Sequence, residues 1–496
     1  MRNFTVLGLI ACQILFSIVQ GFTPLVPTHG YTYYLEAARV KAWPSCPYRF
    51  LSYAENSNNI DLYNSAGSNQ QWQVIDTGSG DGTFYLKTNF GKYLSYTGDC
   101  SSTVVDSWTA AGVNQKFRFV VGDNTQFEYY LEAAGRSQCE YKYVSFPVGC
   151  TTSSPDKIGL SKATGADQRF RIYPVSSTNP VQHNAATSFV CPDPYAWYTG
   201  SEYKIQCSWG MLPMGSSPDL NPTTSQFILE GELLGGMPAP WAADDNANRW
   251  APENYETVDG KYNYVFFSDD QPDGKHRLGW ARSSTGPKVN AYSTYSASYL
   301  DLGMAAGGDI DSTMFTDTNG KTYLVWKTDD NSVGSPTTRI WAQELSFAND
   351  TVTEVGSGVV LMDSAGLWWV TSFVEGGSLV EGPEMIFLNG YYYLFFAAGR
   401  YCTDSYTEGV ARSRSFFGPY EKMTSPLLST GIVGTAKSPS SGKQERLVGP
   451  GHASIVHATD GSWKIIYHAS IGDNCDRYAF IGDLVFGEDG WPYLNM

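Results

Sequence analysis

The sequence lacks the features that would place the chain in a membrane or on a nucleic acid. After an apolar run from Phe4 to Val19, no apolar stretch reaches the ~18 residues that a membrane-spanning helix needs, and residues 491–496 do not form an anchor-type hydrophobic tail. The net charge is −16, which repels a polyanion but leaves a neutral polysaccharide unaffected. We therefore expect neither a membrane nor a nucleic acid as a partner.

The apolar run near the N-terminus is typical of a signal peptide. It follows Arg2, and it is too short to cross a bilayer comfortably. Val19 and Gly21 are small residues at the spacing that a signal peptidase accepts. We interpret residues 1–21 as a signal peptide and expect a secreted, extracellular protein.

The cysteines lack the CxxC spacing of a zinc site. Nine are present, and loss of Cys12 with the signal peptide leaves an even number, which favours disulfides in a secreted chain. Cys139 with Cys150, and Cys191 with Cys207, are close enough in sequence to bridge neighbouring strands. The sequence alone does not determine the connectivity.

Residues 31–175 contain a threefold repeat and no helix signal. The segment 33–38 reappears at 129–134, with a weaker copy at 84–87. Each unit ends on a Gln-x-aromatic triplet, and these triplets are 70–72, 115–117 and 168–170. A period near fifty residues with strand-like segments predicts three stacked β units.

The repeated triplets resemble those of the β-trefoil in ricin-type carbohydrate-binding modules. The resemblance implies an N-terminal β-trefoil over residues 31–175 and a candidate carbohydrate-binding module. In that family an acidic residue and an aromatic residue of each unit hold the sugar, and the sequence alone does not identify the acidic residue here. A trefoil with a structural role or another ligand stays open. Residues 176–188, rich in Ser, Thr, Asn and Pro, are interpreted as a linker.

Residues 189–496 carry five hairpin signals at regular spacing. Each is a glycine after Thr, Asp or Asn and before an aromatic or β-branched run, and the glycines are Gly200, Gly260, Gly320, Gly390 and Gly461. Sixty to seventy residues without an amphipathic helix hold about four strands, the size of a propeller blade. The predicted fold class is all-β, with an N-terminal β-trefoil followed by a five-bladed β-propeller.

Acidic residues recur at similar places before these turns. Asp311, Glu381 and His452 each lie nine residues before the turn glycine of their blade, Asp193 seven before and Trp250 ten before. The innermost strands of a propeller line its axis, so these side chains are expected to converge at one end. A single Asp there is usually a turn former, but three carboxylates together would be costly to bury without a use. Glycoside hydrolysis needs one carboxylic acid to protonate the leaving oxygen and one carboxylate to activate water.

These segments resemble glycoside hydrolase family 43, whose arabinanases, arabinofuranosidases and β-xylosidases act by inversion. Pro192-Asp193-Pro194 resembles the family's base motif, which implies that Asp193 is the general base. Glu381-Gly382-Pro383 resembles the acid motif, which implies that Glu381 is the general acid. Asp311 stands where the family keeps its pKa-modulating aspartate, and the neighbouring Asp309 competes for that assignment.

The resemblance also implies substrate-binding residues and an axial cation. Trp250, in Trp-Ala-Pro-Glu, matches a segment that contributes to the sugar pocket, and Trp369 is a second candidate that could equally pack in the core. His452, in Gly-Pro-Gly-His, is expected on the axis as a substrate contact and candidate metal ligand. A structural calcium or sodium ion would bind there, and no cofactor is expected to be required.

The implied function is that of a secreted glycoside hydrolase acting on plant-type polysaccharide or oligosaccharide. The segment 391–396 and its continuation to residue 420 resemble the arabinofuranosidase and arabinanase branch, which implies cleavage of α-L-arabinofuranosyl linkages by an inverting acid/base mechanism. β-Xylosidase and β-1,3-galactanase stay as alternatives. An inactive glycan-binding protein is the alternative of another class. A monomer is expected.

Overall fold

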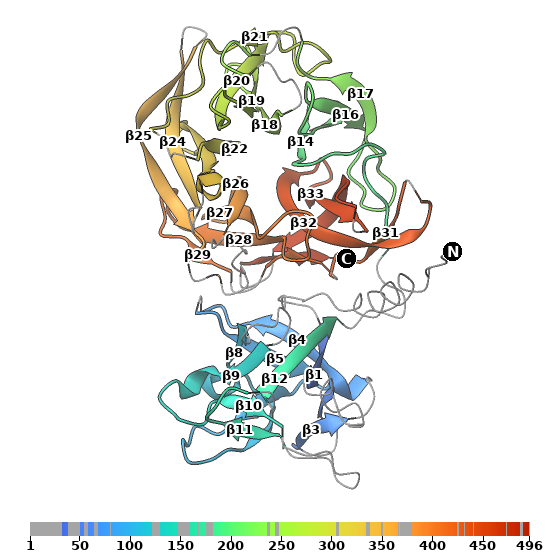
Figure 1. Ribbon diagram of the computed structural model, residues 1–496, viewed down its shortest axis with the longest axis vertical. Coiled ribbons are helices and arrows are strands. Elements are labelled where there is room, and N and C mark those ends of the chain that lie inside the picture. Colours follow the sequence, from blue (N-terminus) through green and yellow to red (C-terminus); the bar gives the residue numbers. More distant parts are fainter. Residues whose placement is uncertain are drawn as a thin grey trace, which may run out of the picture.

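The computed structural model contains two β-rich bodies that follow each other along the chain (Figure 1). It describes residues 32–37, 50–53, 58–63, 68–79, 81–121, 129–146, 158–165, 168–174, 182–235, 239–243, 248–303, 307–333, 338–348, 351–365, 367, 379–423, 426–430, 432–439, 441–472, 474–486 and 490–495. The expected signal peptide, residues 1–21, lies outside these ranges, as does Trp369. No helix among the described residues is long and apolar enough to cross a membrane.

The N-terminal body consists of three successive groups of four strands. The first group is β1 (Thr32–Ala37), β2 (Phe50–Tyr53), β3 (Ile60–Tyr63) and β4 (Gln71–Asp76). The second is β5 (Phe84–Thr88), β6 (Tyr93–Tyr96), β7 (Val105–Trp108) and β8 (Phe117–Val121). The third is β9 (Tyr129–Ala133), β10 (Tyr143–Ser145), β11 (Gly159–Ser161) and β12 (Arg169–Pro174).

The outer strands of the three groups pair in a closed ring. The order of pairing is β1, β4, β5, β8, β9, β12 and back to β1, all antiparallel, while β2–β3, β6–β7 and β10–β11 form hairpins. The glutamine of each repeated triplet is buried and donates to a serine of its own group: Gln70 to Ser52, Gln115 to Ser95 and Gln168 to Ser145, at 2.7–2.8 Å. The repeated glutamines therefore satisfy buried polar groups in the core.

The second body is a five-bladed β-propeller, as the sequence predicts. Blade 1 is β14 (Tyr195–Tyr198), β15 (Tyr203–Gln206), β16 (Pro213–Ser217) and β17 (Ile228–Glu232). Blade 2 is β18 (Trp250–Glu256), β19 (Asn263–Asp270), β20 (His276–Ser283) and β21 (Thr294–Tyr295). Blade 3 is β22 (Asp309–Thr316), β23 (Thr322–Thr328), β24 (Arg339–Ala348) and β25 (Thr351–Asp363).

The last two blades complete the ring in Figure 1. Blade 4 is β26 (Val380–Leu388), β27 (Tyr391–Ala398), β28 (Thr407–Ser413), β29 (Glu421–Lys422) and β30 (Leu428–Ser429). Blade 5 is β31 (Thr435–Lys437), β32 (Gln444–His457), β33 (Trp463–Ile471), β34 (Arg477–Phe486) and β35 (Pro492–Asn495). The five turn glycines stand in the hairpin that follows the innermost strand of each blade, with φ between 66° and 93°, a conformation that favours glycine.

The segment expected to be a linker contacts the propeller within its described part. Gln182 and His183 form β13, which pairs in parallel with Thr435 and Ala436 of β31. Farther on, the N–H of Ala186 donates to the carbonyl of Ala479 at 2.7 Å. Residues 182–186 are thus part of blade 5. The two bodies also touch, because Ile432 is buried in the hydrophobic core of the N-terminal body.

Three disulfides join described residues. Cys191–Cys207 pairs as the sequence suggests, and Cys402–Cys475 joins loops of blades 4 and 5. The pairing of Cys139 with Cys150, which the sequence left open, does not form, because Cys139 bonds Cys100. The turn that carries Cys139 lies against residues 99–102, where the buried Arg136 guanidinium donates to the carbonyl of Ser102 at 2.8 Å.

Candidate active site

One residue in or just before each innermost strand has a left-handed backbone. These residues are Asp193, Ala251, Asp311, Gly382 and His452, with φ between 46° and 57°. In blades 2 to 5 the pairing register shifts directly around this residue, as in a β-bulge. A bulge re-aims the side chains beside it. The same local distortion, repeated in the blades, therefore presents side chains at one end of the propeller.

The structural equivalence differs by one residue from the spacing in the sequence. Gly382, and not Glu381, is equivalent to Asp311 and His452, and Glu381 shares its place with Trp250. The count from the turn glycine was inexact because the hairpin of blade 4 is one residue shorter than that of blade 3. Glu381 therefore points into the site from a different position in its blade than Asp311 does.

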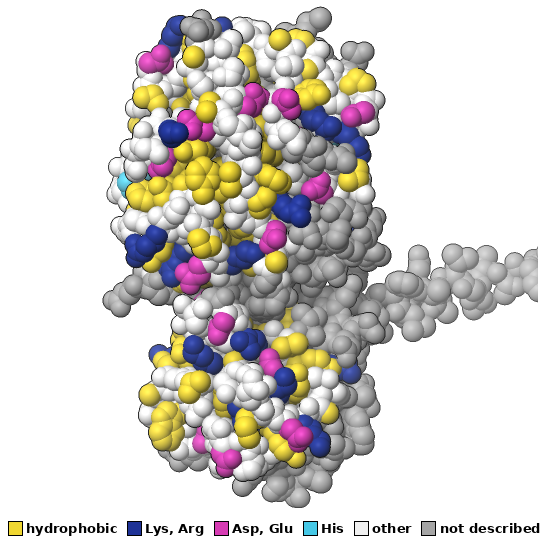
Figure 2. Space-filling model, turned by 90° about the vertical axis from the view of Figure 1, so that its left-hand side faces the viewer, with side chains coloured by type: hydrophobic (Ala, Val, Ile, Leu, Met, Phe, Trp, Pro, Cys, Tyr) yellow, Lys and Arg dark blue, Asp and Glu magenta, His cyan; other side chains and the backbone are white. Residues whose placement is uncertain are grey.

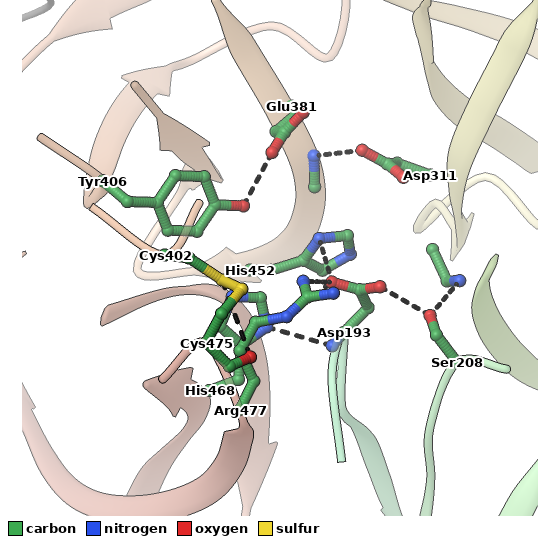
Figure 3. A network of polar contacts seen from close by, with 12 residues as sticks. Asp193, Ser208, Asp311, Glu381, Cys402, Tyr406, His452, His468, Cys475 and Arg477 are labelled. Carbon is green, nitrogen blue, oxygen red and sulfur yellow. Dashed lines mark hydrogen bonds and ion pairs between the residues drawn. A yellow bond between two sulfur atoms is a disulfide. The ribbon is translucent and has the colours of Figure 1, made fainter. Parts of the chain in front are cut away.

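Asp193 is held by charged and polar groups from blades 1 and 5 (Figure 3). Its Oδ1 lies 3.1 Å from Nη1 of Arg477 and 3.3 Å from Nδ1 of His452, and its Oδ2 accepts a hydrogen bond of 2.5 Å from the Ser208 hydroxyl. Burial alone would raise the pKa of this carboxyl, but the neighbouring charges of Arg477 and His452 outweigh it and hold the pKa well below its usual range. These contacts therefore favour the ionised form of Asp193.

His468 supports Asp193 from below as a neutral ring. Its Nδ1 accepts a 3.0 Å hydrogen bond from the backbone N–H of Asp193, so this nitrogen carries no proton. Burial, together with the charge of Arg477, lowers the pKa of His468 well below its usual value. The 3.4 Å approach of the same Nδ1 to Asp193 Oδ1 is therefore not an ion pair. His468 also stacks on Tyr406, with ring centroids 5.6 Å apart.

Glu381 is contacted by two donors from blades 3 and 4. Its Oε2 lies 2.9 Å from Nζ of Lys327, and its Oε1 accepts a hydrogen bond of 2.8 Å from the Tyr406 hydroxyl. Lys327 is almost fully buried and its Nζ also lies 3.1 Å from Oδ1 of Asp329. The second carboxylate offsets part of the lysine charge. Glu381 and Asp193 are thus held by separate sets of partners, without a direct contact drawn between them in Figure 3.

Asp311 is buried close to these groups. Its Oδ2 accepts a 3.0 Å hydrogen bond from the N–H of Gly382, next to Glu381. Burial raises the pKa of Asp311 to about 6, and the negative charge of Glu381 adds to this while His452 opposes it. The competing candidate Asp309 bonds the Trp326 indole at 3.2 Å, and burial raises its pKa to about 7. The contact with Gly382 favours Asp311 over Asp309 as the neighbour of Glu381.

Trp250 stands beside this group, at the start of β18. Its ring stacks on His276 with centroids 3.5 Å apart and an interplanar angle of 17°. His276 in turn lies 3.3 Å from Oδ1 of Asp270. One face of the tryptophan is therefore covered by protein, and the ring is fixed in place. Among the residues that the structure describes, Asp193, Asp311, Glu381 and His452 come together in one site.

The described residues do not form a protein cage for a metal ion. No group of three or more His, Cys, Asp or Glu side chains in the described part is arranged to hold one. Nδ1 of His452 faces the carboxylate of Asp193 at 3.3 Å, as in an ion pair. His452 could supply one ligand to a cation, and water would have to supply nearly all the others.

A second polar layer lies two residues farther along the innermost strands. Its members are Tyr195, Glu253, Thr313, Glu384 and Ser454. The Thr313 hydroxyl donates to Glu384 at 3.1 Å, and the N–H groups of Met314 and Ile455 donate to Glu253 and Glu384 at 2.6 and 3.3 Å. Burial raises the pKa of Glu384 to about 8 and that of Glu253 well above its usual value. Burial in this layer therefore favours the protonated form of both acids.

Sequence reasoning missed most of the partners that hold the acids. Lys327 and Arg477 lie on strands outside the innermost ones, where no family motif marks them, and Tyr406 lies in the segment 391–420 but was given no role in the site. A usable signal exists for Ser208 and Arg477, because each lies within two residues of a disulfide cysteine, Cys207 and Cys475. Glu253 belonged to the recognised Trp-Ala-Pro-Glu segment but lies in the second layer.

The N-terminal body carries acidic residues that the sequence did not single out. In the hairpins, Asp61 stands opposite Ser52 and Asp106 opposite Ser95. Two residues farther along, Tyr63 and Trp108 are 48% and 54% exposed. The third group has Gly159 and Ser161 at these places. Two of the three groups thus present an aspartate beside an exposed aromatic ring.

Known proteins match the propeller. A xylosidase/arabinosidase of Butyrivibrio fibrisolvens is 26% identical over 316 residues, which cover 61% of this chain and 54% of the relative. A β-D-galactofuranosidase of Aspergillus niger is 24% identical over 287 residues, 55% of this chain and 71% of the relative. This chain thus spans about half the length of the first relative.

A solved structure and a family profile cover the same region. The crystal structure of a thermostable family-43 glycoside hydrolase is 23% identical, with a TM-score of 0.50 over 62% of this chain and 93% of that chain, which supports the fold. The profile of the glycosyl hydrolases family 43 matches residues 178–492, more than half of the chain. The protein is therefore a glycoside hydrolase that belongs to glycosyl hydrolases family 43.

Proposed function

We propose that the chain is a secreted enzyme that cleaves α-L-arabinofuranosyl linkages of plant-type polysaccharide with inversion of configuration. The observation that carries the proposal is the division of the site between two carboxylates with separate partners. Asp193 is kept ionised by Arg477 and His452, whereas Glu381 lies with Lys327 and Tyr406 in blades 3 and 4. An inverting hydrolase needs one ionised base and one acid on opposite sides of the scissile bond.

In the proposed reaction Asp193 accepts a proton from a water molecule, and the water oxygen attacks the anomeric carbon. Glu381 donates its proton to the leaving oxygen as the glycosidic bond breaks. The cycle ends with Asp193 protonated and Glu381 ionised, and exchange with solvent restores both. Lys327 stabilises the carboxylate that Glu381 becomes, because its ammonium lies 2.9 Å from Oε2. Trp250, with its ring fixed on His276, would stack on the sugar.

β-Xylosidase activity is the second candidate, because the Butyrivibrio relative is a xylosidase/arabinosidase. The Aspergillus relative adds β-D-galactofuranosides to the substrates to be tried. A β-1,3-galactanase and an inactive glycan-binding protein are the remaining alternatives. An inactive protein would not need an ionised Asp193 and a separately held Glu381.

We also propose that the N-terminal body is a β-trefoil that binds glycans. Its ring of six strands and three hairpins supports the fold, and Asp61 with Tyr63 and Asp106 with Trp108 support two sugar sites. An exposed ring can stack on a sugar while a carboxylate accepts its hydroxyl protons. The same proposal includes secretion, a monomeric state and activity that requires no cofactor. A calcium or sodium ion bound at His452 would act on the reacting groups only indirectly. Activity after chelation and dialysis tests this.

Hydrolysis of a small set of substrates tests the proposed specificity. The set consists of aryl α-L-arabinofuranoside, aryl β-D-xyloside, aryl β-D-galactofuranoside and linear arabinan. The highest kcat/KM is expected on the arabinofuranoside. Preference for the xyloside would replace the proposed substrate with the second candidate. Binding of glycans without turnover of any substrate would favour the inactive protein.

A further inference from the structure

A cavity lies between blades 2 and 3 at the end of the propeller opposite to the catalytic acids. Its volume is about 660 Å³, and it is lined by the hairpin 255–264, the turn 320–322 and residues 344–347 of β24. β18 runs from Trp250, beside the catalytic acids, to Glu256, next to this cavity. At about 3.3 Å per residue the two places are separated by roughly 20 Å. The cavity is therefore separate from the active site.

Three partly exposed aromatic rings line the cavity. Tyr255, Tyr262 and Phe347 are half-buried, and the rings of Tyr255 and Phe347 lie 4.9 Å apart at 33°. The Tyr255 hydroxyl is hydrogen-bonded to Thr322 Oγ1 at 3.0 Å, which anchors the ring to blade 3. Rings fixed in this way can stack on the apolar C–H face of a sugar without further ordering.

The charges of the lining cancel. It contains two lysines, Lys261 and Lys321, and two acids, Asp259 and Glu344, and Lys321 pairs with Glu344 at 2.6 Å. A phosphorylated or acidic ligand would find no excess of positive charge here. A ligand that combines hydroxyl groups with apolar faces and carries no charge fits both the rings and the paired polar groups.

The surface around this region is mixed in character. Figure 2 views the side of the molecule that carries β24 and β25, and there hydrophobic side chains gather among scattered basic and acidic ones. The valines of β25 contribute, since Val355 and Val359 are 41% and 42% exposed. A long polymer could continue from the cavity across such a surface.

We propose that this cavity is a second carbohydrate-binding site, which holds a neutral stretch of the polysaccharide substrate while another stretch occupies the active site. The inference rests on the proposed function for the class of ligand. It predicts that loss of the cavity lowers the affinity for long polysaccharides and leaves the cleavage of small substrates unchanged.

The test measures the mobility of the wild-type full chain and of Phe347→Ala in affinity gels. One gel contains soluble linear arabinan and another contains arabinoxylan. Retardation of the wild type is expected, with a loss of affinity of at least about threefold in the variant. Ser346→Trp, which fills the cavity from β24, provides a second variant whose fold does not depend on removing a packed ring. Tyr198→Ala, an exposed aromatic ring at the same end of blade 1, is the matched control and should bind as the wild type does.

Turnover of aryl arabinofuranoside or aryl xyloside separates this proposal from the proposed function. Both cavity variants should keep kcat/KM within about twofold on the small substrate. Unchanged binding of both variants, no binding of either polymer by the wild type, or preferential binding of polygalacturonate would overturn the second site. A wild type that binds polymer through the cavity but turns over no small glycoside would instead overturn the proposed function alone.

Discussion

Nη1 of Arg477 lies 3.1 Å from Oδ1 of Asp193, although 284 positions separate the two residues in sequence. Arg477 begins β34 in blade 5, and Asp193 precedes β14 in blade 1, so the contact crosses the junction where the ring closes. Closure of the propeller therefore also completes the environment of the proposed base.

Replacing Arg477 should move the acid limb of the pH–rate profile. Without the guanidinium, burial dominates and the pKa of Asp193 rises, by about 1–3 units for the loss of an opposite charge at this distance. In Arg477→Met the acid limb of kcat/KM on an aryl glycoside is expected at higher pH. Arg477→Lys keeps a charge and should shift it less. If the acid limb stays in place in Arg477→Met, Asp193 is not the general base.

The pair formed by Lys327 and Asp329 should control the alkaline limb. Nζ of Lys327 lies 2.9 Å from the Glu381 carboxyl, and loss of this cation disfavours the carboxylate, so Lys327→Met should extend activity to higher pH. Asp329→Asn leaves the lysine charge without its second partner and should move the limb the other way. The sign of these two shifts is measured in kcat/KM against pH. Shifts of equal sign in the two variants would contradict the role of Lys327.

The disulfide Cys402–Cys475 should matter for catalysis. It joins the loop that leads to Tyr406, which contacts Glu381, with the loop that leads to Arg477, which contacts Asp193. The double variant Cys402→Ser/Cys475→Ser is expected to lose about 2–4 kcal/mol of stability and to show a lower kcat below its melting temperature. The matched control Cys100→Ser/Cys139→Ser, in the N-terminal body, should leave kcat on an aryl glycoside unchanged. Equal kcat in both double variants would argue against a positioning role.

Glu384 should make the folded chain less stable as the pH rises. Its pKa is raised from 4.5 to about 8 in the folded state by burial, so between these values the unfolded chain has released a proton that the folded chain still holds. Stability then falls with rising pH, by up to about 1.4 kcal/mol per unit. Glu384→Gln should remove this part of the slope, and its melting temperature relative to the wild type should rise between pH 5 and pH 8. Glu256→Gln, at an exposed site, is the control. If the melting temperatures of Glu384→Gln and the wild type change in parallel with pH, Glu384 is not a buried protonated acid.

Much of the fold could be predicted because short segments of the sequence indicate it without tertiary contacts. Each blade has a hairpin whose turn requires a positive φ, so its glycine and the following β run are visible without any tertiary information. The motifs around Asp193, Trp250, Asp311, Glu381 and His452 are local as well. Their order along the chain indicated the family, and the ring of blades then brought them to one end.

What the sequence did not predict depends on contacts between distant strands. Lys327 and Arg477 are single basic residues in strand sequences with no motif of their own, and only the ring geometry turns them toward Glu381 and Asp193. Glu381 was aligned one residue out of phase because the hairpins differ in length. The sequence left the partner of Cys139 open, and the fold brings Cys100, 39 residues away, within 5.2 Å between Cα atoms.

The stereochemistry of the first-formed sugar tests the central claim most directly. If Asp193 activates water and Glu381 protonates the leaving oxygen, attack comes from the face opposite to the departing group. Proton NMR of an aryl α-L-arabinofuranoside during the first turnovers should then show the β-anomer of the free sugar before mutarotation. First appearance of the α-anomer would mean retention through a covalent intermediate and would contradict the assignment of Asp193 as the general base.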